Sequence, residues 1–318
     1  MDKKEEAMGR KHSFLKLLTA TGIALLAANK YVEKKAKDKN KVHTTGSYFK
    51  YKYGDVNYNV YGEGSTLILI HDLDPMASSY EWEEIIDTLA ENYTVYVLDL
   101  LGCGQSDKPN ITYTNYMYVD MLHHFMDEVV GEKATLLTSH NASAIGFMCN
   151  HMYPESIDKI IAINPNDLDE VTFETTQKDK LRKSILYMPI IGTAIYNANY
   201  TEEKIRNVLR ETYFNNAENV SKYFDLYYQL AHHKESKSRY LYASIACKYT
   251  NINIENGIKD KNNIIIIQSN NRFRKDRIES AYAEINPKIK SLSIDNSKLL
   301  PQLEVPENLA SIILEILK

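Results

Sequence analysis

Cysteine is scarce in this sequence of 318 residues. Cys103, Cys149 and Cys247 lie far apart, each in an apolar stretch. Three such residues argue against a disulfide framework and against a cysteine-based metal site. Hydrophobic residues make up 44% of the chain and charged residues 25%, which is typical of a globular protein. We therefore expect a domain that is stabilised by packing and not by cross-links.

The sequence also lacks an apolar run of full membrane-spanning length. The uncharged stretch 17–28 lies between Lys16 and Lys30, whereas a spanning helix usually needs about 20 residues. Flanking lysines that snorkel and neighbouring aromatic residues could extend it. We predict a charged tail over residues 1–13, an anchor-like hydrophobic helix over 14–32 and a charged spacer over 33–45. This arrangement predicts a membrane-associated protein; a cleaved signal peptide and a helix packed on the body are the alternatives.

Positive charge is concentrated at the N-terminus. Residues 1–45 contain eleven Lys and Arg residues against five Asp and Glu residues, although the whole chain has a net charge of −4. The rest of the chain is therefore acidic, and an acidic surface binds nucleic acid poorly. We expect no nucleic-acid partner.

Strand and helix patterns alternate from residue 46 onward. Two tyrosine-rich alternating stretches around a Gly-Asp turn predict a hairpin, and buried strands follow at LILIHDL, TVYVLDL, ATLLTS, KIIAINP and NIIIIQS. Helical segments between these strands predict an α/β domain with a mostly parallel sheet over residues 46–318. The interval from about 167 to 258 is too long for one crossover and contains amphipathic helices. It predicts a helical cap inserted between two strands.

The segment GEGSTLILIHDLDPMASSYEWEEIIDTLAENYTVYVLDLLGCGQSDKP closely resembles the N-terminal half of α/β-hydrolase-fold proteins. The loop LLGCGQSDKP carries the most specific match, in Gly102, Gly104, Ser106, Asp107 and Pro109. The position of the cap and the closing PQLEVPE are similar to the branch of esterases, haloalkane dehalogenases and epoxide hydrolases. This resemblance implies the fold but does not by itself imply an activity.

The resemblance implies a nucleophile on a sharp turn between a strand and a helix, with the pattern G-x-[Ser/Asp/Cys]-x-G. The stretch HNASAIGF aligns best with His140 at the nucleophile position. Thr138 and Ala142 then replace the two glycines of the pattern. Shifted registers offer Asn141 or Ala142, which are no better suited to this chemistry.

The acid of the triad is expected within about four residues after the strand NIIIIQS. Asn271 and Arg272 occupy that position, and Asp276 lies beyond the turn. Some relatives take the acid after the preceding strand, where Asp167 is available. The acid position is therefore either replaced or moved to Asp167.

Two further positions depart from the resemblance. The base histidine is expected five residues before Glu304, where the chain has Leu299, and no histidine follows His233. The oxyanion loop is expected to read His-Gly, whereas this chain reads His71-Asp72. A carboxylate there opposes a developing oxyanion. The sequence thus predicts a degenerate catalytic triad.

The favoured interpretation is a membrane-tethered pseudo-hydrolase that binds a small hydrophobic ligand under its cap, or a protein partner. An active esterase-like hydrolase, with His140 assisted by Asp72 or Asp167, is the first alternative. A structural scaffold with a filled pocket is the second. His71, Asp72 and Asn141 are expected to lie near His140. His71, Asp72 and His140 could together bind a metal ion, but they have no sequence-local ligand spacing, so no metal and no cofactor are predicted.

Overall fold

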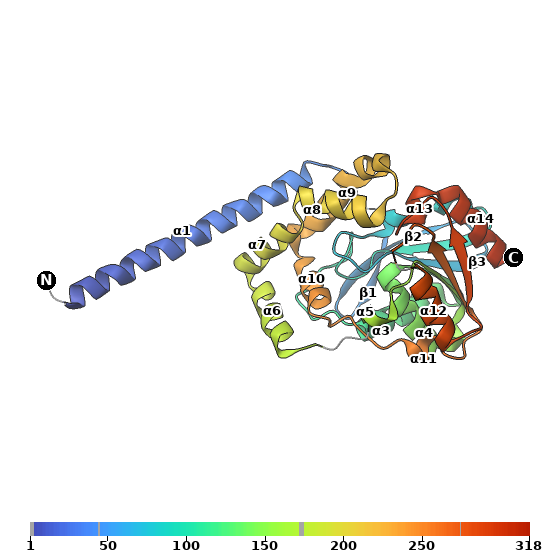
Figure 1. The fold of residues 1–318 in the computed structure, drawn as a ribbon. Coiled ribbons are helices and arrows are strands. Elements are labelled where there is room, and N and C mark those ends of the chain that lie inside the picture. The colour runs from blue at the N-terminus through green and yellow to red at the C-terminus, as the bar shows by residue number, and fades with distance from the viewer. Residues whose placement is uncertain (1–2, 44, 172–174, 274) are drawn as a thin grey trace.

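The centre of the molecule is an eight-stranded sheet (Figure 1). The computed structural model describes residues 3–43, 45–171, 175–273 and 275–318. The strands lie in the order β1-β2-β4-β3-β5-β6-β7-β8; β1, β2 and β4 pair antiparallel, and every later pairing is parallel. Their bounds are β1 Ser47–Tyr51, β2 Gly54–Tyr61, β3 Ser65–Ile70, β4 Tyr93–Leu98, β5 Ala134–Ser139, β6 Ile157–Ile163, β7 Ile264–Ser269 and β8 Lys290–Ile294.

Helices cover both faces of this sheet, which explains why the central strands are almost continuously apolar. One face packs against α3 (Asn115–Phe125), α4 (Ser143–Met152) and α12 (Lys275–Ile285). The other packs against α2 (Ile86–Ala90) and α14 (Pro306–Leu317), with Trp82 of η1 (Ser79–Trp82) fully buried between them and the sheet. The predicted mostly parallel sheet flanked by helices is confirmed.

Helices inserted between β6 and β7 lie over the carboxyl ends of the strands. They are α5 (Leu168–Val171), α6 (Gln177–Tyr187), α7 (Pro189–Asn199), α8 (Glu202–Val208), η5 (Leu209–Tyr213), α9 (Ala217–Ser236) and α10 (Arg239–Ala246). Buried aromatic side chains of η5 and α9, including Tyr213 and Tyr227, pack in one cluster with Met76 and Leu300 of the body. The space under this part of the cap is therefore filled. The short helix α11 (Glu255–Ile258) packs on α4, where Ile258 joins the main core.

The N-terminus forms one helix, α1 (Lys3–Lys37), which extends away from the body (Figure 1). Its C-terminal part is held by the cap. Ala36 is buried, the Asn29 side chain donates to the carbonyl of Ile190, and Lys35 forms an ion pair with Glu202. The helix includes most of the predicted tail and the whole predicted anchor, and it ends at Lys37 within the predicted spacer.

The predicted membrane anchor over residues 14–32, and with it the predicted membrane association, is wrong. In the part of the chain that the structure describes, no helix has the length and apolar character needed to cross a bilayer. The physical reason is the short apolar stretch between Lys16 and Lys30, which the polar residues around it do not lengthen.

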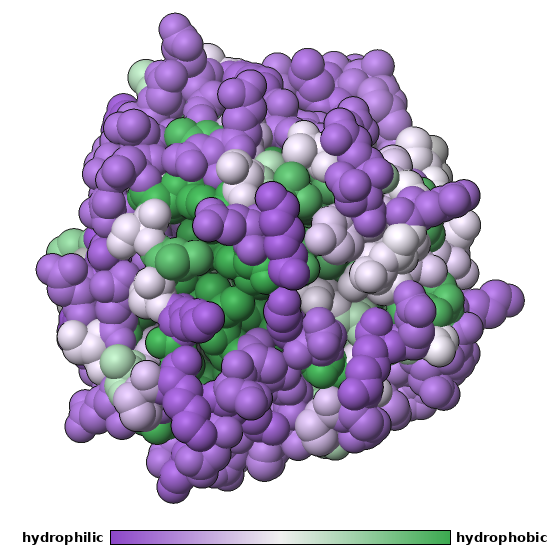
Figure 2. Space-filling model, turned by 90° about the vertical axis from the view of Figure 1, so that its right-hand side faces the viewer, coloured by the Kyte–Doolittle hydropathy of each residue, from purple (hydrophilic) through white to green (hydrophobic). Residues whose placement is uncertain are grey.

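Apolar side chains are also exposed at the surface. Leu17 and Ile23 of α1 have relative exposures of 64% and 62%, and Ile191 of α7 has 47%. Figure 2 shows the face turned away from the free end of α1, where hydrophilic residues surround an apolar area near the centre. Exposed apolar surface is thus not confined to the N-terminal helix.

Candidate functional site

The turn after β5 holds His140 in a conformation that non-glycine residues rarely adopt. β5 ends at Ser139, η3 (His140–Ala142) makes the turn, and α4 begins at Ser143. His140 has a φ of 43°, in the left-handed region, which costs a non-glycine residue on the order of 1 kcal/mol. A strained residue between a strand and a helix is the geometry expected at a nucleophile turn. The residue with that geometry is His140.

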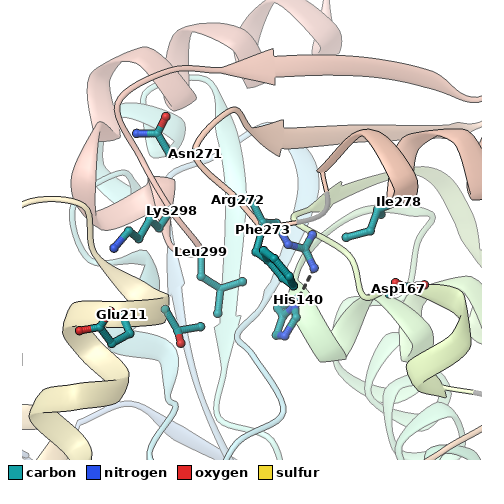
Figure 3. A pocket seen from close by; sticks show the side chains of 10 residues that line it. His140, Asp167, Glu211, Asn271, Arg272, Phe273, Ile278, Lys298 and Leu299 are labelled. Atoms are coloured by element: carbon teal, nitrogen blue, oxygen red, sulfur yellow. Dashed lines mark hydrogen bonds between the residues drawn. The ribbon is translucent and has the colours of Figure 1, made fainter.

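The ring of His140 is fixed by the segment after β6. Its Nδ1 lies 3.0 Å from the carbonyl oxygen of Asn164. Because a carbonyl only accepts, Nδ1 must carry the proton in this contact. Arg272 Nη2 lies 3.5 Å from the same nitrogen (Figure 3), so these two N–H groups meet as two donors. The guanidinium therefore places a positive charge beside the ring, and it cannot accept a proton from His140.

The backbone amide after His140 is occupied by a carboxylate. Asn141 N donates to Asp72 Oδ1 at 2.9 Å, and Asp72 is 2% exposed. In the α/β-hydrolase arrangement this amide is one of the oxyanion donors. Burial raises the pKa of Asp72 to about 6, although the hydrogen bond from Asn141 favours the ionised form. Around neutral pH, Asp72 therefore carries a negative charge at the position where a hydrolase stabilises the negative charge of an oxyanion.

Two more carboxyl groups lie beside Asp72. Glu81 Oε2 accepts from the backbone amide of Asp72 at 3.0 Å and thereby fixes the loop. Burial, and then the charge of Asp72, raise the pKa of Glu81 well above its ordinary value and that of Asp74 to about 7. The loop after β3 is therefore an acidic region held in the protein interior.

His71 has a structural role in this loop. Its Nε2 accepts from the backbone amide of Leu100 at 2.9 Å, and its Nδ1 donates to the carbonyl of Asp72 at 2.6 Å. Burial lowers the pKa of His71, which agrees with a neutral ring. Both ring nitrogens are engaged, so His71 cannot bind a metal unless these bonds break. Within the described residues, no group of three or more His, Cys, Asp or Glu side chains is arranged to hold a metal ion.

The residues at the predicted base and acid positions have other contacts. Leu299 is 4% exposed and belongs to the apolar cluster under the cap. Arg272 Nη1 donates to the carbonyl of Pro165 at 2.6 Å. Asp167 is buried, and its Oδ2 lies 3.4 Å from Nε of Arg277. At the base position, Leu299 brings a hydrocarbon side chain, which cannot accept a proton.

A cavity of about 320 Å³ opens beside His140, between η5 and the loops that follow β7 and β8 (Figure 3). Arg272 and Phe273 point toward His140, with Leu299 beside them and Asp167 on the far side. Five residues predicted for the site thus line one cavity. The residues that line it are His140, Asp167, Glu211, Thr212, Asn271, Arg272, Phe273, Ile278, Lys298 and Leu299.

Sequence reasoning missed the residue that connects these loops, Asn164. Its side-chain nitrogen donates to the carbonyls of Lys298 and Leu299, both at 2.9 Å, and its own carbonyl accepts from His140. Asn164 is fully buried. A polar residue directly after a buried parallel strand was the available signal, because such positions face the site in open α/β sheets. Glu81, Asp74 and Lys298 were missed as well, and their sequence context gave no comparable signal.

Comparisons with known proteins identify the family and the fold. The profile of the family described as "alpha/beta hydrolase fold" matches residues 75–233. The 2-hydroxy-6-oxo-6-(2'-aminophenyl)hexa-2,4-dienoic acid hydrolase of Metapseudomonas resinovorans is 28% identical over 34% of this chain and 38% of its own length. The haloalkane dehalogenase of Agrobacterium fabrum is 28% identical over 39% of this chain and 41% of its own length.

A solved structure, described as a serine hydrolase involved in carbazole degradation, superposes with a TM-score of 0.67. It is 17% identical to this chain, and the match covers 86% of this chain and 98% of that one. An identity this low shows the fold alone. The sequence matches to the first curated relatives span 31% to 38% of their lengths. Their activities therefore do not transfer directly to this protein.

Proposed function

We propose, from the premise that this chain belongs to the α/β hydrolase fold family, that it is a catalytically degenerate member whose cavity at His140 binds a small ligand. The chain would then use the family's scaffold and site position for recognition without hydrolysis. The proposal concerns the cavity alone and does not involve a membrane.

The observation that carries this proposal is the hydrogen bond from Asn141 N to Asp72 Oδ1. An oxyanion hole works because its donors are directed at the position where negative charge develops, and losing one donor costs about 10²–10³ in kcat. Here that donor is already satisfied by a buried carboxyl group. Any oxyanion at this place would also be repelled by the charge of Asp72. Acyl transfer by the usual route is therefore disfavoured for two reasons: the amide of Asn141 is already occupied, and the charge of Asp72 repels an oxyanion at this place.

The second support is the lack of a base. A serine-type mechanism needs a histidine that takes the proton of the nucleophile, and its carboxylate holds that histidine in place. Leu299 cannot accept a proton, and the sequence contains no histidine after His233 that a shifted alignment could supply. His140 itself uses Nδ1 to donate to Asn164. A missing base and an occupied amide together argue for lost catalysis.

The test is hydrolysis of activated esters and of an epoxide by the purified full chain, with a serine hydrolase assayed alongside. We expect turnover that cannot be distinguished from buffer, and no change on His140→Ala. Turnover well above buffer that His140→Ala abolishes would contradict the proposal.

An active hydrolase with unconventional residues is the second candidate, and it rests on one observation. His140 combines strained backbone geometry with access to an open cavity, which is the setting of a nucleophile. In that case Asp72 or Asp167 would assist the imidazole. The same assay decides between the two candidates, because only this one predicts turnover that depends on His140. The open cavity argues against a scaffold with a filled pocket.

A further inference from the structure

Exposed apolar side chains are concentrated on three neighbouring helices, α1, α6 and α7. In the part of the chain that the structure describes, these helices carry nine of the eighteen exposed large apolar side chains, although they make up less than a fifth of the sequence. α7 lies between the other two and packs against both (Figure 1). Apolar side chains gathered in this way mark a surface that binds another molecule. We call it the cap–arm surface; its residues are Leu17, Ile23, Leu26, Tyr31, Leu181, Ile185, Met188, Ile191 and Ile195.

The cap–arm surface contains a groove of about 340 Å³ between α6 and α7. Leu181 and Ile185 line it from α6; they are four residues apart and therefore lie on one face of that helix. Ile195 of α7 and Tyr242 of α10 contribute to its apolar wall. Grooves of this kind accept the apolar side chains of another helix, whereas proline-rich segments bind in aromatic-lined grooves. The shape and the lining therefore favour a helix as the occupant.

The surface around this groove is basic. Residues 16–37 and α6 contain nine Lys and Arg residues, of which Lys183 packs on aromatic rings. The carboxylates that interact with the other eight are those of Glu33, Asp179, Glu202 and Glu235. Eight cations against four carboxylates leave a positive excess even when every carboxylate is counted as fully paired.

Part of this excess lies at the groove itself, which Lys178 and Arg182 line one helical turn apart. Arg182 donates to the carbonyl of Ala246 at 3.2 Å, and its charge also acts on the carboxylate of Asp179. With Arg182 and Asp179 counted as a neutral pair, Lys178 still gives the groove a positive charge. An acidic side chain is the group that this charge attracts.

Charge also distinguishes between possible occupants. The whole chain has a net charge of −4, so the cap–arm surface is opposite in sign to the rest of the molecule. A second copy that bound through the same surface would bring equal positive charges together, which disfavours a symmetric pair. An acidic amphipathic helix instead brings apolar side chains to the groove and carboxylates to the cations around it.

We infer that the cap–arm surface binds an acidic amphipathic helix of a partner protein. Apolar side chains at i, i+3, i+4 and i+7 of that helix occupy the groove between α6 and α7 and the exposed side of α7. Its acidic side chains meet Lys178 and the lysines of α1. The groove shares no residue with the cavity at His140, so this inference does not depend on the proposed function.

The first experiment uses synthetic peptides of about 20 residues, a length at which an isolated helix can form, and the unmodified full chain. The probe has Leu at i, i+3, i+4 and i+7 spacing and Glu, Gln and Ala elsewhere. One control has Lys in place of every Glu, and the other has the probe's composition in scrambled order. Fluorescence anisotropy measures their binding.

We expect the acidic probe to bind with a Kd of about 100 µM or lower, and each control to bind at least about tenfold more weakly. The comparison is sharp because the net negative charge of the chain by itself favours the Lys peptide. Binding of the probe should weaken as NaCl rises from about 50 mM to about 500 mM. Equal or tighter binding of either control, or no binding of the probe at about 1 mM, overturns the inference.

The second experiment measures the binding of the acidic probe to variants. Leu181→Glu and Lys178→Glu should each weaken it at least about tenfold, because both residues line the groove. The matched controls are Met152→Glu, at an exposed apolar residue of α4, and Lys290→Glu, at an exposed cation of β8, and neither should change binding. Unchanged binding to both groove variants overturns the inference. If they do not fold, the comparison of the peptides on the unmodified chain still decides.

Two other occupants are outcomes of the same series. Light scattering after size-exclusion chromatography that shows a dimer, together with its loss in Leu181→Glu, assigns the surface to a second copy. Flotation with vesicles of phosphatidylcholine and phosphatidylglycerol that is lost in Leu181→Glu, without binding of the acidic probe, assigns it to lipid. Either result overturns the inference.

Discussion

The replacement of Asp72 by Asn should change how the stability of the protein depends on pH. Burial raises the pKa of Asp72 from 3.8 to about 6. Between these two values the folded state binds more protons at this site than the unfolded state does, so stability falls as pH rises. The contribution of Asp72 is fully present below pH 3.8 and is lost above about pH 6. At about 1.4 kcal/mol per pKa unit, the loss is at most about 3 kcal/mol.

Asn keeps an oxygen that can accept from Asn141 N but has no proton to lose in this range. We therefore expect Asp72→Asn to gain up to about 3 kcal/mol of unfolding free energy relative to the unmodified protein between about pH 4 and about pH 7. Removing the charge of Asp72 also removes its repulsion of the carboxylates of Asp74 and Glu81. This effect also raises the unfolding free energy of the variant relative to the unmodified protein. Buried histidines titrate in this window too, but they are present in both proteins and largely cancel.

Urea unfolding of both proteins over this pH range, followed by far-UV circular dichroism, measures the difference. Asp127→Asn is the control, because Asp127 is exposed, and its difference from the unmodified protein should stay small and flat. If the difference in unfolding free energy between Asp72→Asn and the unmodified protein does not change with pH, the pKa of Asp72 is the same in the folded and the unfolded state. A difference of opposite sign would show a stabilised carboxylate, and either result would refute the assignment of burial as the dominant effect.

Three other changes test the site and the N-terminal helix. A fourfold variant should hydrolyse activated esters measurably in a stopped-flow assay, whereas His140→Ser alone should not, because it lacks a base. This variant carries His140→Ser, Leu299→His, Asn271→Asp and Asp72→Gly. His140→Gly should be more stable than His140→Ala by about 1 kcal/mol in urea unfolding, because only glycine adopts a positive φ without strain; equal stabilities would contradict the strain. Ala36→Leu should cost about 1–3 kcal/mol of unfolding free energy, since Ala36 is buried against the cap. The same change at Ala28, which is exposed on the same helix, is the control and should cost little.

The fold could be predicted because its signals are local. Strands such as β3 and β7 are nearly continuous apolar runs, and such runs indicate burial on both faces of a parallel sheet. The residue at the expected base position could also be read directly, since position 299 is Leu in the sequence. These features need no knowledge of how distant segments meet.

The contacts that define the site could not be predicted in the same way. The hydrogen bond from Asn141 to Asp72 joins loops after two different strands and depends on the orientation of one carboxyl group. The approach of Arg272 to His140 joins two loops that are far apart in sequence. The membrane prediction failed for a different reason, which is local: the apolar stretch between Lys16 and Lys30 is too short for a helix that spans a bilayer.

The filled space under the cap has a consequence for the rate at which a ligand enters and leaves. Tyr213 and Tyr227 pack the cap to the body, while the cavity at His140 opens at the edge of η5. Entry from the edge does not require the cap to open, a step that in gated enzymes takes microseconds to milliseconds. Association would then be limited by diffusion and orientation, with residence time set by the strength of the contacts alone.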